Sequence, residues 1–99
     1  MRVISRKALR EFWNKSGHAD AEQPLRSWFR ETSKADWANS AEVKSMFRSA
    51  SIVGRNRIVF NIAGNKYRLV VHVNYPFRVV YVRFVGTHRE YDKINVREV

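Results

Sequence analysis

The sequence predicts a two-layer α+β domain, with an N-terminal strand and helices packed on one face of an antiparallel sheet. Two observations indicate this class. Apolar residues recur at helical spacing through the first half of the chain, and from about Ile52 onward they alternate with a period of two. A chain of 99 residues accommodates one hydrophobic core, so residues 1–99 are expected to form a single domain.

The first half of the chain is predicted to contain a short strand and three helices. The strand covers Arg2–Ile4, and Ser5 is expected to cap a helix that runs through Lys15. A second helix is expected from about Asp20 to Lys34, in which Pro24 is tolerated because it lies near the first turn. A third, short helix should begin at Asn39.

The second half is predicted to be a meander of three long strands. They cover Arg57–Ile62, Lys66–Asn74 and Phe77–Val85. The turn Ala63-Gly64-Asn65 separates the first two strands, because Gly and Asn tolerate positive φ, and Tyr75-Pro76 separates the last two.

Alternation sorts the side chains of these strands onto two faces. In the middle strand one face carries Tyr67, Leu69, Val71 and Val73, which are expected in the core, and the other carries Lys66, Arg68, Val70 and His72. In the last strand one side carries Val80, Val82 and Phe84, and the other Val79, Tyr81, Arg83 and Val85. This register would place Arg68 and Arg83 together on an uncovered face, in a groove of the right polarity for RNA.

The composition points to a polyanionic or acidic partner. There are 19 Lys and Arg against 9 Asp and Glu, a formal net charge of +10. Basicity alone is shared by ribosome-associated and membrane-surface proteins, and it does not show whether RNA is cut. The lack of Cys excludes disulfides, thiolate catalysis and Cys-ligated zinc. No apolar stretch approaches the ~20 residues of a membrane span, so a cytoplasmic protein without a membrane partner is expected.

A polar segment after the last strand could carry chemistry. Cleaving RNA without a metal requires activation of the ribose 2′-hydroxyl, stabilisation of charge on the phosphorane and protonation of the leaving 5′-oxygen. Residues Thr87–Lys93 concentrate His, Tyr, Lys and Arg, and histidine is the residue type suited to proton transfer near neutral pH. The alternative is an ordinary charged surface loop. Arg68 could likewise grip a phosphate through two hydrogen bonds or be a solvated strand residue.

The remaining histidines and basic residues give weaker signals. His72 is either a partly buried sheet residue or a catalyst, and His18 is expected to be structural or solvated. The three histidines lack the spacing of metal ligands, so no metal site and no cofactor are predicted. Arg55, Arg57 and Lys66 would extend the basic charge along the hairpin, although each alone could be surface decoration. The tryptophans Trp13, Trp28 and Trp37 are assigned to the core.

Two segments resemble the HigB toxins of the RelE superfamily. They are Val59–Val71, with a Gly-Asn turn before the Tyr-Arg-Leu-Val strand, and Val85–Ile94, with its Thr-His-x-Glu-Tyr-Asp motif. The similarity extends to Asp36–Asn39 and to Met1–Ser5, so it covers essentially the whole chain.

This resemblance implies a RelE-like fold and the toxin half of a toxin-antitoxin pair. The implied activity is metal-independent cleavage of mRNA in the ribosomal A site by transesterification through the 2′-hydroxyl, which gives a 2′,3′-cyclic phosphate. The implied partners are the ribosome, mRNA and a HigA-type antitoxin with a helix-turn-helix fold. Operator DNA would be reached only through the antitoxin complex.

The resemblance also implies roles for individual residues. Arg68 takes the position of the superfamily's phosphate-gripping arginine, and His88 and Tyr91 are the acid/base pair, with the two roles left open. The expected substrate or rRNA contacts are Arg55, Arg57, Asn61, Lys66, Arg83 and Lys93. The wider superfamily carries a lysine pair in the strand before the Gly turn, whereas this chain has Arg57–Asn61 there, which leaves the general base open.

Two other functions share these features. One is a noncatalytic module that binds RNA or the ribosome and blocks translation by occupancy, which would create no new mRNA 5′ ends. The other is a superfamily toxin with a non-RNA target such as gyrase, which a supercoiling assay would identify.

Overall fold

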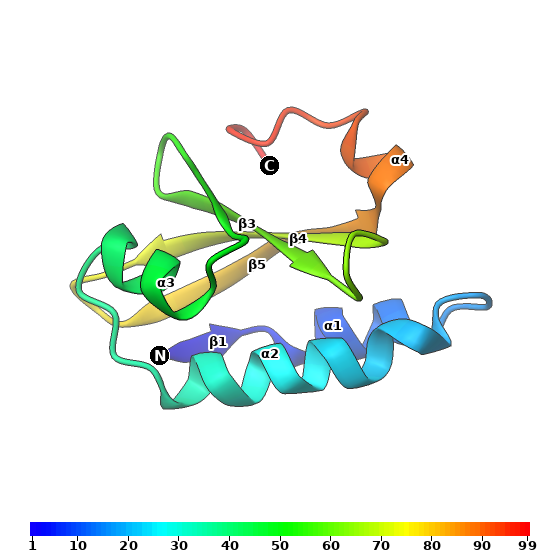
Figure 1. Ribbon diagram of the computed structural model, residues 1–99, viewed down its shortest axis with the longest axis horizontal. Coiled ribbons are helices and arrows are strands. Elements are labelled where there is room, and N and C mark those ends of the chain that lie inside the picture. Colours follow the sequence, from blue (N-terminus) through cyan, green and yellow to red (C-terminus); the bar gives the residue numbers. More distant parts are fainter.

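The computed structural model describes all 99 residues and contains one mixed sheet with the two N-terminal α-helices on one side (Figure 1). In chain order the elements are β1 (Arg2–Ile4), α1 (Arg6–Trp13), the 3₁₀ helix η1 (Ala19–Ala21), α2 (Glu22–Lys34), α3 (Ser40–Met46), β2 (Ser51–Val53), β3 (Arg57–Ile62), β4 (Tyr67–Asn74), β5 (Val79–Thr87) and α4 (His88–Tyr91). None of the helices is both long and apolar enough to span a membrane.

The sheet has the strand order β1-β5-β4-β3-β2. The strands β2 to β5 form an antiparallel meander, and β1 pairs in parallel with β5, with Val3 opposite Val80. The predicted α+β class is therefore confirmed. The first strand, β1, does not pack on a face of the sheet but forms one of its edges. Because β1 runs parallel to β5 while the other pairs are antiparallel, the sheet is mixed.

The core lies between the helices and one face of the sheet. Leu9 and Leu25 of the helices are fully buried against this face, as are Tyr67, Leu69, Val71 and Val73 of β4, which alternation placed there. Phe60 of β3 packs edge-on against Trp28 of α2 and Phe47, with ring centroids 5.4 and 5.1 Å away. These contacts hold β3 and β4 in place, and they therefore also set the positions of the side chains on the opposite face of the two strands.

Capping residues set the helix ends. Ser5 accepts a hydrogen bond from the Ala8 amide as predicted, but α1 ends at Trp13, two residues before Lys15. Asn39 caps α3 through the Glu42 amide. The second predicted helix is confirmed, although its first turn is the 3₁₀ helix η1.

A bulge in β5 changes the faces of two residues. The register between β4 and β5 shifts between Val70 and Val71, which pair with Phe84 and Val82, so Arg83 has no partner across the ladder. Beyond such a bulge the alternation is reversed. The predicted sides of Phe84 and Val85 are therefore wrong: Phe84 shares the face of Arg68, and Val85 packs against the core.

The face away from the helices is partly covered. Figure 1 shows the segment after β5 on the opposite side of the sheet from α1 and α2. Arg57 of β3 donates a hydrogen bond to the carbonyl of Val99 at 2.8 Å, and Val59 and Val70 on this face are buried. The expectation of a fully uncovered face was thus wrong, because the C-terminal residues fold back over its centre.

Candidate active site

Arg68 is the second residue of β4, the central strand of the sheet, and projects onto the face away from the helices. It lies opposite Asn61 of β3 and Gly86 of β5, while the adjacent Leu69 is fully buried in the core. Its guanidinium donates hydrogen bonds to the carbonyls of Asn65, at 3.1 Å, and Tyr67, at 3.5 Å. Arg68 is half-buried, so the sheet holds the guanidinium in place without enclosing it in apolar surroundings.

Tyr91 of α4 lies against Arg68. The Arg68 Cζ is 5.9 Å from the centroid of the Tyr91 ring, a cation–π arrangement, and the Tyr91 ring is 6.5 Å from that of Phe84. The bulge that turns Phe84 to this face thus supplies an apolar neighbour for Tyr91. Two predicted site residues from distant parts of the sequence meet here.

A capping box holds α4 at the end of β5. The Thr87 side chain accepts a hydrogen bond from the Glu90 amide at 3.2 Å, and the Glu90 carboxylate accepts one from the Thr87 amide at 2.8 Å. The latter bond lowers the pKa of Glu90, which keeps the carboxylate ionised. A helix of one turn has little stability of its own, so this box fixes where His88 and Tyr91 point.

Gly86 lets the strand, the helix and Phe84 come together. A Cβ atom at this buried position would lie 2.5 Å from Cζ of Phe84 and 3.0 Å from Oε1 of Glu90. A side chain here would therefore have to displace the Phe84 ring. The glycine of the Val-Gly-Thr-His motif is explained by this close approach.

His88 is exposed at the start of α4. Its Nδ1 is 3.2 Å from Oδ2 of Asp92, and its amide donates to the carbonyl of Lys66 at 3.3 Å. Asp92 would favour the tautomer with the proton on Nδ1, which leaves Nε2 free for proton transfer. His88 and Tyr91 are one turn apart and so project from neighbouring positions of α4. The Arg68 guanidinium reaches the Tyr91 ring, whereas the His88 side chain pairs with Asp92 and is linked to Arg68 and Tyr91 only by its place one turn earlier in α4.

A second group of cations lies further along the same face. Arg57 pairs with His72 across the strands, His72 pairs with Tyr81 with stacked rings 6.0 Å apart, and the Arg83 Cζ is 5.4 Å from the Tyr81 ring. Burial lowers the pKa of His72, and the Arg57 and Arg83 guanidiniums lower it further. Arg57 and Arg83 therefore flank a histidine that is held neutral.

The other predicted contact residues are more dispersed. Lys66 turns toward the helices, where its ammonium pairs with Asp20 and lies 5.5 Å from the Tyr67 ring, so the structure does not bring it to the Arg68 group. Asn61 donates a long hydrogen bond of 3.5 Å to Ser49. Arg55 lies in the β2–β3 turn with a positive φ of 62°, and Lys93 is exposed after α4.

Sequence reasoning missed three residues that shape this site. They are Phe84, whose side was misassigned, Glu90, which closes the capping box, and Asp92, which contacts His88. Two signals were available: Thr87-x-x-Glu90 has the spacing of a capping box, and His88 and Asp92 have the i, i+4 spacing of helix neighbours. Nowhere in the structure, this site included, do three His, Asp or Glu side chains come close enough to hold a metal ion.

Comparison with known proteins adds an independent line of evidence. Residues 21–94 match the model of a family described as HigB_toxin, RelE-like toxic component of a toxin-antitoxin system. The chain is also similar to a protein named mRNA interferase HigB from Escherichia coli O6:H1, with 25% identity over 96 residues, which cover 95% of this chain and 91% of that relative. The matched family region contains Arg68, His88 and Tyr91.

Proposed function

The chain belongs to the HigB family of RelE-like toxins of toxin-antitoxin systems, and on this premise we propose that it is an endoribonuclease that cuts mRNA on the ribosome. The relative from Escherichia coli carries the name mRNA interferase. The observation on which the proposal chiefly rests is the contact between Arg68 and Tyr91, with His88 one helix turn away, on an accessible part of a sheet face. A guanidinium, a phenol and an imidazole supply the group types that RNA cleavage without a metal requires.

In the proposed reaction the ribose 2′-hydroxyl loses its proton to a base and attacks the adjacent phosphorus. The bond from phosphorus to the 5′-oxygen breaks, and that oxygen takes a proton from an acid, leaving a 2′,3′-cyclic phosphate and a 5′-hydroxyl. Arg68 stabilises the extra negative charge on the phosphorane, because its guanidinium can donate two parallel hydrogen bonds. His88 and Tyr91 are the proposed acid/base pair.

The second group of cations would hold the RNA backbone beside this centre. Arg57 and Arg83 lie on the same sheet face as Arg68 and carry full charges beside the neutral His72. Arg55, Asn61 and Lys93 would add outer contacts to mRNA or rRNA. Lys66, which is paired with Asp20, is assigned at most a peripheral electrostatic role.

We propose the ribosomal A site as the place of the reaction, as the family resemblance implies, and this fits a site whose residues Arg68, His88 and Tyr91 are partly or fully exposed and line none of the pockets. A shallow site gains much of its rate from a substrate that another body holds in the reactive geometry, and the ribosome would do so for mRNA. The antitoxin is proposed to be a HigA-type helix-turn-helix protein in the cytoplasm, and operator DNA would be bound only through that complex.

The test is 5′-end mapping of a defined mRNA on purified, programmed ribosomes. The wild-type chain should create new 5′-hydroxyl ends within the translated region, and Arg68→Ala should lower their yield by about 10²-fold or more. Arg89→Ala is the matched control, since it removes a neighbouring positive charge that makes no contact in the site. Ribosome stalling without new ends would contradict the proposal and favour a blocker that acts by occupancy.

A further inference from the structure

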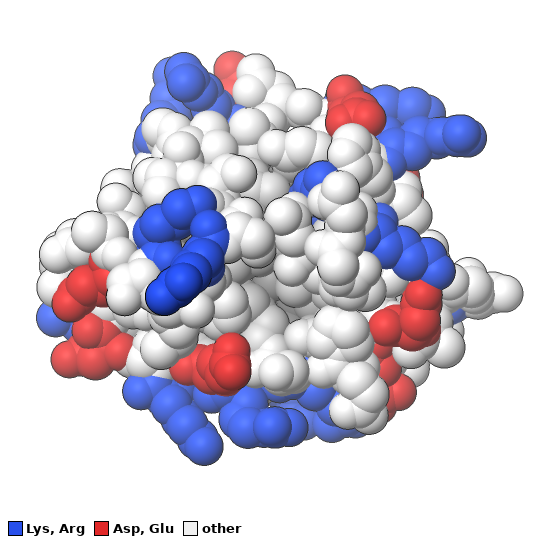
Figure 2. Space-filling view, in the orientation of Figure 1, with Lys and Arg blue, Asp and Glu red and all other residues white.

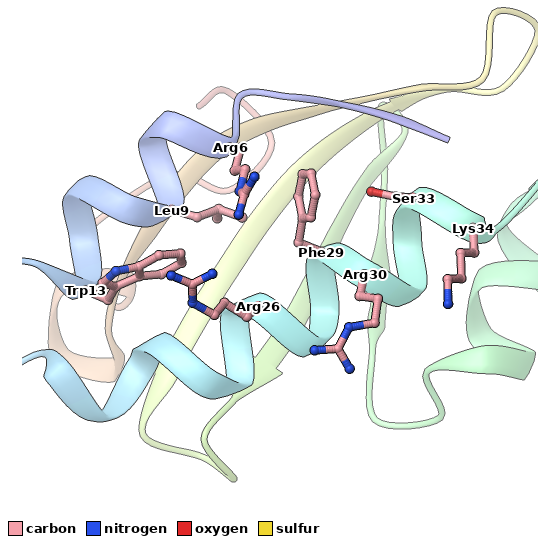
Figure 3. A pocket seen from close by; sticks show the side chains of 8 residues that line it. All are labelled: Arg6, Leu9, Trp13, Arg26, Phe29, Arg30, Ser33 and Lys34. Carbon is pink, nitrogen blue, oxygen red and sulfur yellow. The ribbon is translucent and has the colours of Figure 1, made fainter.

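A groove separates α1 from α2 on the helical side of the molecule, away from Arg68 (Figure 3). It has a volume of about 320 Å³ and is lined by Arg6, Leu9, Trp13, Arg26, Phe29, Arg30, Ser33 and Lys34. Its apolar part consists of Phe29 with the buried Leu9 and Trp13 beneath it; Arg6 and Arg26 lie among these side chains, and Arg30 and Lys34 extend away from them along α2 (Figure 3). None of the lining residues is acidic.

The positive charge at this groove is arranged unfavourably for the free chain. Arg26, Arg30 and Lys34 follow one another at i, i+4 and i+8 along α2, and like charges at this spacing repel. Only Arg26 has a carboxylate partner, Glu22, at 2.8 Å. Figure 2 shows basic side chains gathered along the lower margin of the molecule, below α2. An acidic partner would relieve this repulsion.

The aromatic rings of the groove favour a peptide over a nucleic acid. The Arg6 Cζ is 5.2 Å from the centroid of the Phe29 ring, and the Arg26 Cζ is 5.0 Å from that of Trp13. These guanidiniums occupy the ring faces on which bases would stack. Aliphatic side chains, in contrast, could pack against the exposed part of Phe29, above the buried Leu9.

We propose that this groove binds an acidic, amphipathic segment of the antitoxin. Apolar side chains of the segment would enter between α1 and α2, and its carboxylates would pair with Arg6, Arg30 and Lys34. The proposal depends on family membership for the existence of an antitoxin, and it does not depend on the Arg68 chemistry. The groove and the proposed active site lie on different sides of the sheet, so they can be changed separately.

The test variant is the double charge reversal Arg6→Glu with Arg30→Glu. Both changes suit the folded helices: a glutamate at the first residue of α1 favours the helix dipole, and one at position 30 lies four residues from both Arg26 and Lys34. Arg10→Glu is the matched control, because Arg10 is exposed on α1 and does not line the groove.

Affinity is measured by calorimetry with the purified cognate antitoxin, and mRNA cleavage is measured on programmed ribosomes. The double variant should bind the antitoxin at least about tenfold more weakly and keep its cleavage activity, so that more antitoxin is needed to suppress its toxicity. The control should keep wild-type affinity.

Unchanged antitoxin affinity in the double variant would overturn the proposal. Loss of ribosome binding and of cleavage, with antitoxin affinity unchanged, would also overturn it and assign the groove to RNA. If the wild-type chain cuts no mRNA, the proposed function fails, yet the comparison of antitoxin affinities still decides the role of the groove.

Discussion

The guanidinium of Arg68 and the ring of Tyr91 lie 5.9 Å apart, although one belongs to the start of the central strand and the other to a one-turn helix after the last strand. The pair joins a strand that is hydrogen-bonded on both sides to a four-residue helix with little stability of its own. Tyr91 can therefore act in two ways, through its ring, which packs against Arg68, and through its hydroxyl. A single substitution separates the two.

Tyr91→Phe keeps the ring and removes the hydroxyl. If the hydroxyl takes part in proton transfer, cleavage on programmed ribosomes should fall by about 10²-fold, while the hydrogen-exchange protection of residues 87–92 stays that of the wild type. Single-turnover cleavage assays measure the first quantity and amide hydrogen exchange the second. Tyr81→Phe is the control, because Tyr81 lies on the same face beside His72 and has no proposed part in proton transfer. Full activity of Tyr91→Phe would restrict Tyr91 to a packing role.

Glu90→Ala opens the capping box of α4. The loss should destabilise this helix by about 0.5–2 kcal/mol and reduce cleavage, because Tyr91 and His88 are no longer held in place. Glu90→Gln is the conservative control, since an amide oxygen can still accept the Thr87 hydrogen bond. Amide hydrogen exchange of the α4 residues would report the local change. If both variants kept the hydrogen-exchange protection and the cleavage activity of the wild type, the capping box would be dispensable.

Gly86→Ala tests the close approach of Phe84 and α4. The added methyl group would meet the Phe84 ring, and overpacking of this kind costs about 1–3 kcal/mol. Chemical denaturation measures the change in the free energy of unfolding. Gly54→Ala is the matched control, because a Cβ there would touch only the flexible Arg97 side chain at an ordinary 3.7 Å. A similar small effect of both substitutions would refute the steric argument.

His72 should make stability depend on pH. Burial, with Arg57 and Arg83 nearby, lowers its pKa in the folded chain, and its Nδ1 is buried with no hydrogen-bond partner in the protein. The unfolded chain therefore takes up a proton at higher pH than the folded chain does. The free energy of unfolding should thus decline as the pH falls from about 7 to about 5, and the decline should be smaller in His72→Phe. Identical slopes for the two proteins would contradict this origin.

Much of the fold follows from local sequence signals. Alternation predicted strands at 57–62 and 66–74, which are β3 and β4, and it identified the core face of β4, because that face packs against the helices. Ser5 and Asn39 marked helix starts, since each side chain caps a free amide. The three residues of β2 were too few to show a period, and this strand was not predicted.

The site was less predictable because it depends on tertiary details. Alternation alone cannot reveal a bulge, so the extra residue in β5 misplaced Phe84 and Val85. Lys66 was expected beside Arg68, but a charge partner on the helical side, Asp20, draws it away. The covering of the sheet face by the C-terminal residues likewise had no signal in the sequence, because it is made by an irregular segment with little periodicity.

The one-turn α4 has a consequence for how variants of this chain must be judged. A helix this short opens at a small fraction of the energy needed to unfold the whole domain, so Tyr91 and His88 can lose their positions while the core stays intact. An inactive variant could then have a normal melting temperature, so a measurement of global unfolding would not detect damage to the site. Residue-level probes such as hydrogen exchange at 87–92 are the appropriate standard for every variant made there.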